Sequence, residues 1–242
     1  MITLNVNGLN APIKRQRKPE WIRNHDPHTC CLQETHLRTK DLHRLKVKGW
    51  KQIFQKNGQE KRARVAMLIS DKIDFQRRAI KRDPESHFII VKSRMYQENL
   101  NIVNIYAPII GAPKYIKKIL EDFKKDIDSI TIIVDDFNTL LSKVDRFSKQ
   151  NINKDIVALN SVLDQKALTD IYRAFHPKEG KYTFFSNAHG IFSKIDHMIG
   201  HKTSLNKFKN TEIISSIFSK NKGLELETNL KKKKSDIQIH GI

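Results

Sequence analysis

Short runs of apolar and β-branched residues recur along the chain, separated by polar segments, and this pattern predicts strands. The expected strands cover residues 2–6, 28–33, 50–55, 64–70, 88–93, 100–106, 131–134, 182–185, 194–199 and 212–214. Residues 13–24, 113–127 and 156–168 instead repeat apolar positions at helical spacing. Pro19 falls inside the first of these segments. We therefore expect that helix to be shortened or kinked, because an interior proline costs about 3 kcal/mol.

The order of these elements predicts the fold class. Strands come in consecutive runs as well as alternating with helices, which differs from the strict alternation of a doubly wound parallel sheet. Two sheets packed face to face, with helices outside them, would bury these segments best. No Pro/Gly/Ser-rich linker or repeat divides the chain. We expect one domain over residues 1–226, and a basic, disordered tail over residues 227–242 whose four lysines, 231–234, could also act as a nuclear-localisation signal.

The charge balance changes the picture of function. Lys and Arg total 45 against 26 Asp and Glu, so the net charge is +19. This surplus favours a polyanionic partner, with nucleic acid first, because neutralised phosphates release counterions. A ribosomal-type protein, a membrane-surface protein or a merely solubilising surface would carry similar charge. No apolar run approaches the ~18 residues of a membrane span. The chain opens on an expected strand instead of a secretion signal, so we expect a nuclear or cytoplasmic protein that is not secreted.

The two cysteines, Cys30 and Cys31, are adjacent within an expected strand. Neighbouring strand residues point to opposite faces of a sheet, so a disulfide between them is not expected. Two cysteines also cannot form a cysteine-rich metal site. We expect both to be packing residues in a protein of a reducing compartment.

Three polar residues, Asn5, Glu34 and Asp136, stand in or just after apolar runs that should be buried strands. Side chains at the ends of such strands can point into one shared cleft. Hydrolysis of a phosphodiester needs a hard metal ion on oxygen ligands, a base for the water and donors for the phosphate oxygens. Asn, Glu and Asp are the right residue types for this chemistry. Taken singly, each is more often a turn residue or a helix cap.

Five segments, in order, resemble the signature blocks of one enzyme superfamily. They are Leu4-Asn5-Val6-Asn7-Gly8-Leu9, Gln33-Glu34-Thr35-His36, Asn104-Ile105-Tyr106-Ala107-Pro108, Asp136-Phe137-Asn138 and Ser193-Lys194-Ile195-Asp196-His197. Together they are similar to the apurinic-endonuclease-like branch of the endonuclease/exonuclease/phosphatase superfamily. Connecting segments 46–50 and 182–186 look like those of the endonuclease domain of a long interspersed element (LINE) retrotransposon. The resemblance extends from residue 2 to about residue 226.

The resemblance implies an α/β fold, specifically a four-layer α/β sandwich of two facing mixed sheets with outer helices. It implies a Mg²⁺-dependent DNA endonuclease, with Mn²⁺ as a substitute metal, that nicks DNA and leaves a 3′-hydroxyl primer for reverse transcription. DNA is then the partner of a monomer that needs no membrane and no small-molecule cofactor.

The resemblance also implies roles for individual residues. Glu34 and Asn5 would bind the metal, and Asn7 and Thr183 would contact the substrate. The implied catalytic residues are Tyr106, Asp136, Asn138 and Asp196. Asp136 would activate the water, Asn138 would place the water or the phosphate, Tyr106 would donate toward the phosphate, and Asp196 would orient a histidine. The alternatives are a packed edge tyrosine for Tyr106 and a turn residue that caps its own backbone for Asn138.

Two departures from the family pattern predict a catalytically impaired copy. The family closes its site with a late Ser-Asp-His block, whereas the equivalent stretch here is Ser219-Lys220-Asn221-Lys222-Gly223. Lys220 thus replaces an acidic residue, and Asn221 replaces a histidine that contacts the phosphate. Loss of such a group typically costs about 10²–10⁴-fold in rate. The second departure is Asp135, where the family has glycine. It adds a like charge beside Asp136 and removes the backbone freedom of glycine.

Replacement of the lost histidine by His197 or His189 is not favoured. His197 should point to the opposite face of its strand from Asp196, and His189 lies in an expected loop. Two functions besides an active nuclease therefore stay open. One is a non-catalytic nucleic-acid-binding remnant of a retrotransposon protein, which the missing Asp-His pair favours. The other is a phosphatase of the same superfamily, which the basic charge disfavours.

Overall fold

The computed structural model describes residues 1–37, 39–55, 63–96, 98–147, 152–218 and 221–229. Two six-stranded sheets dominate it. The first sheet has the order β13-β14-β1-β2-β4-β3, and the second has the order β5-β6-β7-β8-β12-β9. The strands of the first sheet are β1 (Ile2–Asn5), β2 (Thr29–Leu37), β3 (Gln52–Gln55), β4 (Ala63–Ile69), β13 (Phe208–Ile214) and β14 (Gly223–Thr228). Those of the second are β5 (Phe75–Arg82), β6 (Phe88–Met95), β7 (Glu98–Tyr106), β8 (Thr131–Asp136), β9 (Leu168–Asp170) and β12 (Asp196–His201).

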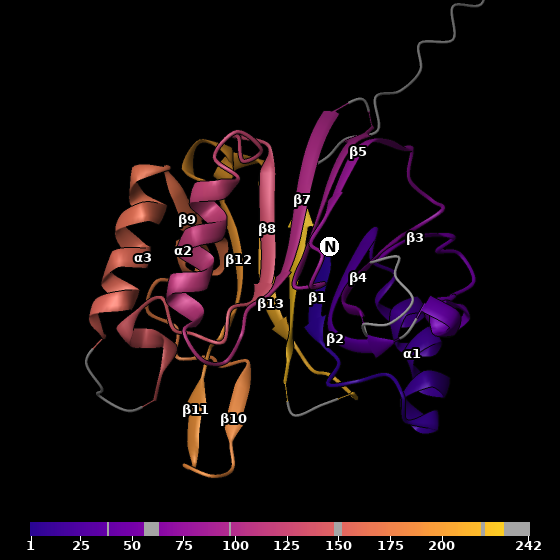
Figure 1. Cartoon of the computed structure of the whole chain (residues 1–242), viewed down its shortest axis with the longest axis horizontal. Coiled ribbons are helices and arrows are strands. Elements are labelled where there is room, and N and C mark those ends of the chain that lie inside the picture. The colour runs from indigo at the N-terminus through magenta and orange to yellow at the C-terminus, as the bar shows by residue number, and fades with distance from the viewer. Residues whose placement is uncertain (38, 56–62, 97, 148–151, 219–220, 230–242) are drawn as a thin grey trace, which may run out of the picture.

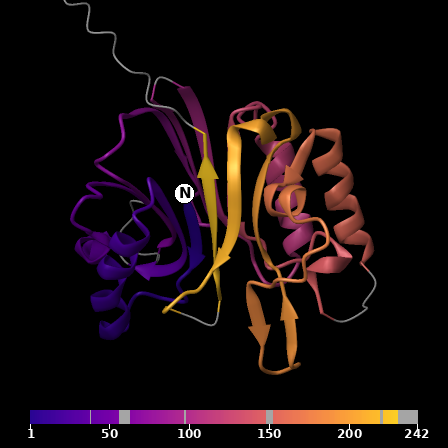
Figure 2. The same ribbon diagram turned by 180° about the vertical axis from the view of Figure 1, so that it is seen from behind.

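Helices cover the outer faces of the two sheets, which makes four layers. Helix α1 (Pro12–His25) lies outside the first sheet, and α2 (Ala112–Asp122) and α3 (Lys154–Gln165) lie outside the second (Figure 1). A short helix, α4 (Ile171–Phe175), follows β9. A small hairpin of β10 (Phe184–Ser186) and β11 (Ile191–Ser193) projects from one end. Seen from behind, β13 and β14 lie beside β1 at the edge of the first sheet (Figure 2).

Both sheets are mixed. β1 pairs in parallel with β2, and β7 pairs in parallel with β8, whereas the neighbouring pairs are antiparallel. This architecture confirms the predicted α/β sandwich of two facing mixed sheets. Among the described helices, none is long and apolar enough to cross a bilayer.

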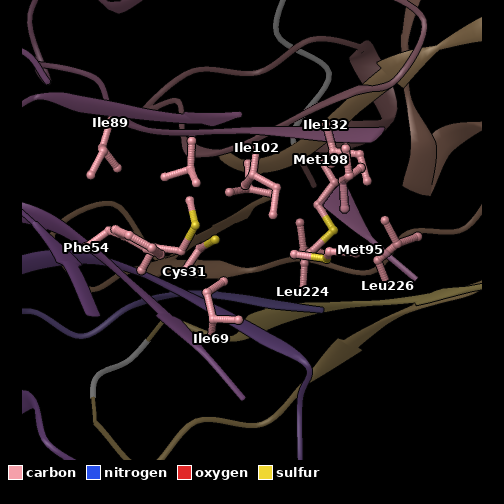
Figure 3. Packing of buried hydrophobic residues seen from close by; sticks show 14 of the residues in the cluster. Cys31, Phe54, Ile69, Ile89, Met95, Ile102, Ile132, Met198, Leu224 and Leu226 are labelled. Atoms are coloured by element: carbon pink, nitrogen blue, oxygen red, sulfur yellow. The ribbon is translucent and has the colours of Figure 1, made fainter. Parts of the chain in front are cut away.

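Alternating side chains divide the hydrophobic core into a central layer and two outer layers. The central layer lies between the sheets, where Ile89, Ile102 and Ile132 face residues such as Cys31 and Leu224 (Figure 3). The outer layers lie beneath the helices. One of them, which includes Cys30, lies between the first sheet and α1, and the other lies between the second sheet and the helices α2 and α3. Cys30 and Cys31 are thus free, buried and on opposite faces of β2, as predicted.

The structure corrects several predicted boundaries. Helix α1 continues through Pro19 to His25, so the expected shortening is wrong. Trp21 and Ile22 beyond the proline are buried, and their packing offsets the lost hydrogen bond. Strand β2 does not end at Glu34 but runs to Leu37. Its pairing with β4 shifts between Gln33 and Leu37, where Glu34 has a positive φ of 51°.

Several elements escaped the sequence pattern. They are the strands β5, β9, β11 and β14 and the helix α4. β5 is an edge strand whose residues are mostly exposed, so it lacks the apolar alternation on which strand prediction depends. β14 runs to Thr228, past the expected domain boundary at residue 226. The predicted disordered tail falls mainly on residues 230–242, which lie outside the described residues.

Candidate active site

A cleft of about 680 Å³ opens at one end of the two sheets, the end from which the β10–β11 hairpin projects. Five of the residues expected in the site from the chemistry or the resemblance line it: Asn5, Asn7, Glu34, Asp136 and Asn138. The remaining lining residues are Ile109, Thr139, Leu140, Arg146, Ile156, Phe184, Ser186, His189, Ser193, Ile195 and Asn221.

The strand pairing explains why these residues meet. β1 and β2 are parallel, so Asn5 and Glu34 emerge from the same edge of the first sheet. β7 and β8 are also parallel, with Tyr106 opposite Asp136 at the corresponding edge of the second sheet. Since the sheets face each other, the four side chains meet across the interface. The Asn5 Nδ2 donates a hydrogen bond of 2.5 Å to Asp136 Oδ2, and the Tyr106 hydroxyl donates to Glu34 Oε1.

Asp136 is buried and held by a hydrogen bond on each oxygen. Asn5 Nδ2 donates to Oδ2, and the backbone N–H of Asn138 donates to Oδ1 over 3.2 Å. Asn5 is fixed in turn, because its Oδ1 accepts from the backbone N–H of Asn7 at 2.8 Å. Burial raises the pKa of Asp136 to about 7, although both hydrogen bonds act to lower it, and the charge of Glu34 adds to the rise. A carboxylate with this pKa can exchange a proton near neutral pH.

Tyr106 is buried on a central strand of the second sheet, so it is not the packed edge tyrosine of the alternative interpretation. Burial, the hydrogen bond to Glu34 and the charge of Glu34 raise the pKa of its hydroxyl. The hydroxyl therefore remains protonated and can act as a donor. It is not a lining residue of the cleft, but it contacts Glu34, which is.

Asp196 lies beneath the cleft, directly opposite Asp136 in the antiparallel pairing of β12 with β8. Burial and the nearby charge of Asp136 raise the pKa of Asp196 well above its ordinary range, and a hydrogen bond with Thr183 lowers it only in part. Its Oδ2 is buried and has no hydrogen-bond partner within the described part of the chain. Its surroundings therefore favour the protonated form of this carboxyl.

Thr183 and Asn7, the two residues expected to contact substrate, lie in different surroundings. Thr183 is buried outside the cleft lining, and its Oγ1 accepts hydrogen bonds from the backbone N–H groups of Ile195 and Asp196 at 3.1 and 3.3 Å. Asn7 is exposed in a turn of positive φ and lines the cleft. The Nζ of Lys14 donates to the Asn7 carbonyl over 2.7 Å and thereby ties this turn to α1.

Asn138 has the backbone conformation of a turn residue, but its side chain does not cap its own turn. Its backbone has a positive φ of 48°, which is typical of a turn asparagine. Its side chain does not bond its own turn, because Nδ2 donates 2.9 Å across to the carbonyl of Ala107. The residue lines the cleft beside Asp136, and so joins the end of β8 to the loop that follows β7.

A buried polar bridge joins the two sheets directly behind the cleft, and the sequence pattern did not reveal it. Gln33 Nε2 donates to Thr3 Oγ1 and to Asn104 Oδ1, each over 2.7 Å. Asn104 Nδ2 donates to the Ala66 carbonyl over 2.9 Å. Gln33 precedes Glu34, and Asn104 shares β7 with Tyr106. The bridge therefore fixes the relative position of the two halves of the site.

The cleft is lined by carboxylate and side-chain amide oxygens that could bind a divalent cation. Within the described residues, no three His, Cys, Asp or Glu side chains form a group that could hold a metal ion. Mg²⁺ usually keeps several waters and takes only one or two protein carboxylates, so it does not require such a group. Glu34, half-buried at the cleft wall, fits such a ligand. Asn5 fits a neighbouring position, although its side-chain oxygen already accepts from Asn7.

The late segment that departs from the family pattern reaches the cleft. Ser219 and Lys220 lie outside the described residues, whereas Asn221 is buried and lines the cleft. His189 also lines it, from the turn of the β10–β11 hairpin. His197 points away, as expected: it is fully buried, with Nδ1 2.8 Å from Asp170 Oδ2 and Nε2 donating to the Thr139 carbonyl over 3.0 Å.

Two expectations concerned Asp135: a like charge beside Asp136, which the structure shows, and a backbone position that needs glycine, which it does not show. Its φ is not positive and it pairs regularly with Ile105 and His197, so the expected need for glycine's backbone freedom is wrong. Its side chain is fully buried, and neither oxygen has a hydrogen-bond partner in the described structure. Burial, with the charges of Asp136 and Asp196, raises its pKa well above the ordinary range.

Sequence reasoning missed several lining residues, of which Arg146 and Ile109 have the clearest chemistry. Arg146 directly follows a short 3-10 helix, Lys143–Asp145, and its backbone pairs with that of Ser193 in β11. Its charge is one of many in a chain with net charge +19, so nothing in the sequence singled it out. Ile109 is an apolar residue in a loop, where apolar patterning carries no positional signal.

Comparisons with known proteins agree with this architecture. The sequence model described as the endonuclease/exonuclease/phosphatase family matches residues 2–217. An AP endonuclease from Archaeoglobus fulgidus has a TM-score of 0.71 at 18% identity, covering 94% of this chain and 98% of that one. The 3′ phosphatase NExo from Neisseria, bound to a product DNA hairpin, has a TM-score of 0.75 at 16% identity, covering 94% and 98%. The endonuclease domain of TRAS1, a telomere-specific non-LTR retrotransposon, has a TM-score of 0.72 at 12% identity, covering 96% and 98%. At these identities the structural likeness shows a shared fold.

Proposed function

This chain belongs to the endonuclease/exonuclease/phosphatase family, and we propose that it is a Mg²⁺-dependent DNA endonuclease of the LINE retrotransposon type in a catalytically impaired copy. One observation carries the proposal. Asn5 and Glu34 from one sheet and Asp136 and Asn138 from the other line a single cleft, and Asn221 lines the same cleft. The first four supply the groups that phosphodiester hydrolysis requires, and the fifth stands where the resemblance places a histidine.

Asp136 is the general base of the proposed reaction. Its pKa of about 7 lets it take a proton from an attacking water near neutral pH. Asn5 and the backbone of Asn138 hold one oxygen each, so the carboxylate cannot rotate freely. Tyr106 is a protonated donor beside Glu34 and can turn toward a phosphate oxygen. Glu34, with Asn5 beside it, would hold Mg²⁺, and the bound ion would neutralise charge on the phosphate.

The impairment follows from Asn221. An asparagine amide can donate a hydrogen bond but cannot become cationic, as an imidazole can near neutral pH. The negative charge that develops on the phosphate therefore loses a positively charged donor. His189 lines the same cleft but lies on the exposed hairpin turn, and no described contact holds its imidazole against the site.

DNA is the proposed partner. The net charge of +19 favours a polyanion, and Arg146 places a permanent cation in the cleft wall. The 3′ phosphatase from Neisseria, which has the same fold, was solved with a product DNA hairpin, and this supports a DNA substrate for a chain of this fold. The similarity of segments 46–50 and 182–186 to LINE endonucleases supports the retrotransposon origin.

Nicking of supercoiled plasmid in Mg²⁺ tests the proposal. We expect slow nicking that Glu34→Ala abolishes, whereas Glu98→Ala, a control at the far end of β7, leaves it unchanged. The double variant Lys220→Asp/Asn221→His should nick about 10²-fold faster than the unmodified chain. Nicking by the unmodified chain at the rate of an intact family member would show that the copy is not impaired. Nicking that survives Glu34→Ala would refute the site itself.

A non-catalytic nucleic-acid-binding remnant is the second candidate, and Asn221 in the cleft favours it too. The same experiment separates the two. A remnant binds DNA but nicks no faster than Glu34→Ala, and the Lys220→Asp/Asn221→His variant recovers nothing.

A further inference from the structure

Two lysines are fully buried among the described residues: Lys18 of α1, and Lys194 in the short segment between β11 and β12. The Nζ of Lys18 donates to the carbonyl of Arg44, and burial lowers the pKa of this amine to about 8. The Nζ of Lys194 instead lies 2.6 Å from Asp170 Oδ2 and 2.9 Å from His197 Nδ1. Both of these partners are buried too, so three ionisable side chains lie together where taking charge out of water is costly.

The carboxylate of Asp170 is shared between a helix and this triad of Lys194, Asp170 and His197. Its Oδ1 caps α4 by accepting from the Tyr172 N–H over 3.0 Å, and this leaves Oδ2 for Lys194. Burial acts to raise the pKa of Asp170, but nearby groups, Lys194 foremost, bring it below its ordinary range. Asp170 is therefore an anion, and it holds the ammonium group of Lys194 in place.

The ammonium group in turn decides which nitrogen of His197 carries the proton. A lysine has three N–H donors and no acceptor. A proton on Nδ1 would set an N–H against the Lys194 ammonium at 2.9 Å, so the geometry favours an Nδ1 that accepts from Lys194. The imidazole proton then lies on Nε2, which is 3.0 Å from the Thr139 carbonyl oxygen, an atom that can only accept. The hydrogen bonds thus run from Lys194 through His197 to Thr139.

Thr139 belongs to the loop that follows β8 and forms part of the cleft wall. Asn138, Thr139 and Leu140 all line the cleft. The Asn138 N–H donates to Oδ1 of Asp136, the proposed base, over 3.2 Å. The bond from His197 to the Thr139 carbonyl therefore holds the loop one residue beyond the amide that orients the base.

We propose that Lys194 and His197 are positioning residues of the proposed active site. Lys194 fixes the tautomer of His197, and the Nε2–H of His197 holds the Thr139 carbonyl. The loop is thereby set so that the Asn138 N–H stays on Asp136. Apolar side chains of similar size would be buried at lower cost than this triad, but they would leave a buried carbonyl without a donor. The effect on the reaction rests on the proposed function, whereas the placement of the loop can be measured without DNA.

Imidazole ¹⁵N NMR in EDTA tests the first step, because long-range ¹H–¹⁵N correlations distinguish a bare ring nitrogen from a protonated one. In the unmodified chain Nδ1 of His197 should be bare and Nε2 protonated. Lys194→Met removes the donor but keeps an unbranched side chain, and it should put a proton on Nδ1, which then donates to Asp170. Asp170→Asn keeps the lysine donor and should leave Nδ1 bare. A protonated Nδ1 in the unmodified chain would overturn the proposal without any variant.

Amide hydrogen exchange tests the second step. The Asn138 N–H should exchange roughly tenfold faster in Lys194→Met than in the unmodified chain, the equivalent of about one net hydrogen bond. His197→Leu should have the same effect, and it decides the point if Lys194→Met does not fold. His197→Gln keeps an amide donor and should restore much of the protection.

Lys18→Met is the matched control, because it removes the other fully buried lysine, which is not among the lining residues of the cleft. It should leave exchange at Asn138 unchanged. Equal acceleration by Lys18→Met and Lys194→Met would mean that exchange reports stability alone, and the positioning role would be wrong.

Single-turnover nicking at saturating DNA connects the placement with the reaction. The rate of Lys194→Met should fall about 10–10²-fold further than that of Lys18→Met, because a small misplacement of reacting groups is costly. DNA affinity should not change, since no exposed charge is removed. A loss of affinity at an unchanged rate would contradict the positioning role. If even the unmodified chain does not nick, the proposed function fails, while the tautomer and the exchange rates still decide the placement.

Discussion

Asp135 is the residue whose chemistry fits its surroundings least. It is fully buried on the face of β8 opposite Asp136, with both oxygens unpaired among the described residues. Burying a polar group without a hydrogen bond costs roughly 1–3 kcal/mol in proteins. Asp135→Ala should therefore raise the free energy of unfolding at pH 7 by about 1–3 kcal/mol, measured by urea denaturation in EDTA.

The pH dependence distinguishes an ionisation cost from a packing cost. The folded state raises the pKa of Asp135 above its ordinary value of 3.8, so folding favours the protonated form. The cost is absent below that value and grows as the pH rises above it. The increase in unfolding free energy from Asp135→Ala should be larger at pH 8 than at pH 5. Asp135→Asn keeps a buried polar side chain that does not ionise, so it should show only the pH-dependent part of this increase. A gain that is equal at both pH values would mean that the carboxyl group does not titrate differently in the fold.

Single residues were predictable from sequence only where their type and their neighbours agreed. Asn5, Glu34, Asp136 and Asn138 were placed by family-like blocks at strand ends, and the structure brings them together in one cleft. Lining residues such as Ile109 and His189 were not placed, because a loop position carries neither periodicity nor a characteristic partner. The catalytic roles themselves stay predictions until activity is measured.

The polar bridge between the sheets acts at the level of the element. Asn104→Ala removes an acceptor from Gln33 and a donor from the Ala66 carbonyl. Each buried group left unpaired costs about 1–3 kcal/mol, so we expect a loss of at least about 2 kcal/mol in unfolding free energy. At a temperature where both variants are folded, the nicking rate of Asn104→Ala should fall further than that of a control variant with a similar loss of stability. Tyr106 and Glu34 would lose the cross-sheet contact that sets their relative position.

Asn101→Ala supplies that control. Asn101 is also a buried asparagine of β7, but it lies toward the far end of the strand and its Nδ2 donates to Asp128 at 3.2 and 3.3 Å. It should reduce stability without changing the nicking rate of the folded protein. Equal loss of nicking by the two variants would mean that the bridge stabilises the fold but does not position the site.

Elements were predicted best where a continuous apolar run is buried and worst where a strand is exposed or tertiary packing overrides local preference. Strands with apolar runs, such as β7 and β8, were found at nearly their true bounds. The polar edge strand β5 was missed because its side chains are mostly exposed. Helix α1 persists through Pro19 because Trp21 and Ile22 bury against the first sheet, a contribution that local propensity does not contain.

At the scale of the whole molecule, the order of strands and helices sufficed to predict two facing sheets. It did not contain the strand order within each sheet. For example, β2 lies between β1 and β4, and this placement depends on long-range strand pairing that no local sequence pattern predicts. Net charge is also a property of the whole molecule. It predicts that binding to a polyanion is electrostatic, but it does not predict which residues make the contacts.

The last prediction therefore concerns salt. A chain of net charge +19 should bind duplex DNA with an affinity that falls steeply as salt rises, because each neutralised phosphate releases counterions.

Residues 231–234 are four consecutive lysines beyond β14, whose last residue is Thr228. A chain ending at Asn229 keeps every described strand. It also keeps the hydrogen bond of 2.8 Å from the Asn229 N–H to the Lys207 carbonyl. If the four lysines contact phosphates, truncation should reduce the slope of log affinity against log salt by about 3–4. Fluorescence anisotropy from 50 to 200 mM salt, roughly the range over which such slopes are resolved, measures this. The matched control replaces the four lysines by serine in the full-length chain and should give the same reduction. An unchanged slope in both would place the phosphate contacts on the folded domain, where Arg146 of the cleft wall and basic residues elsewhere on the domain would have to supply them all.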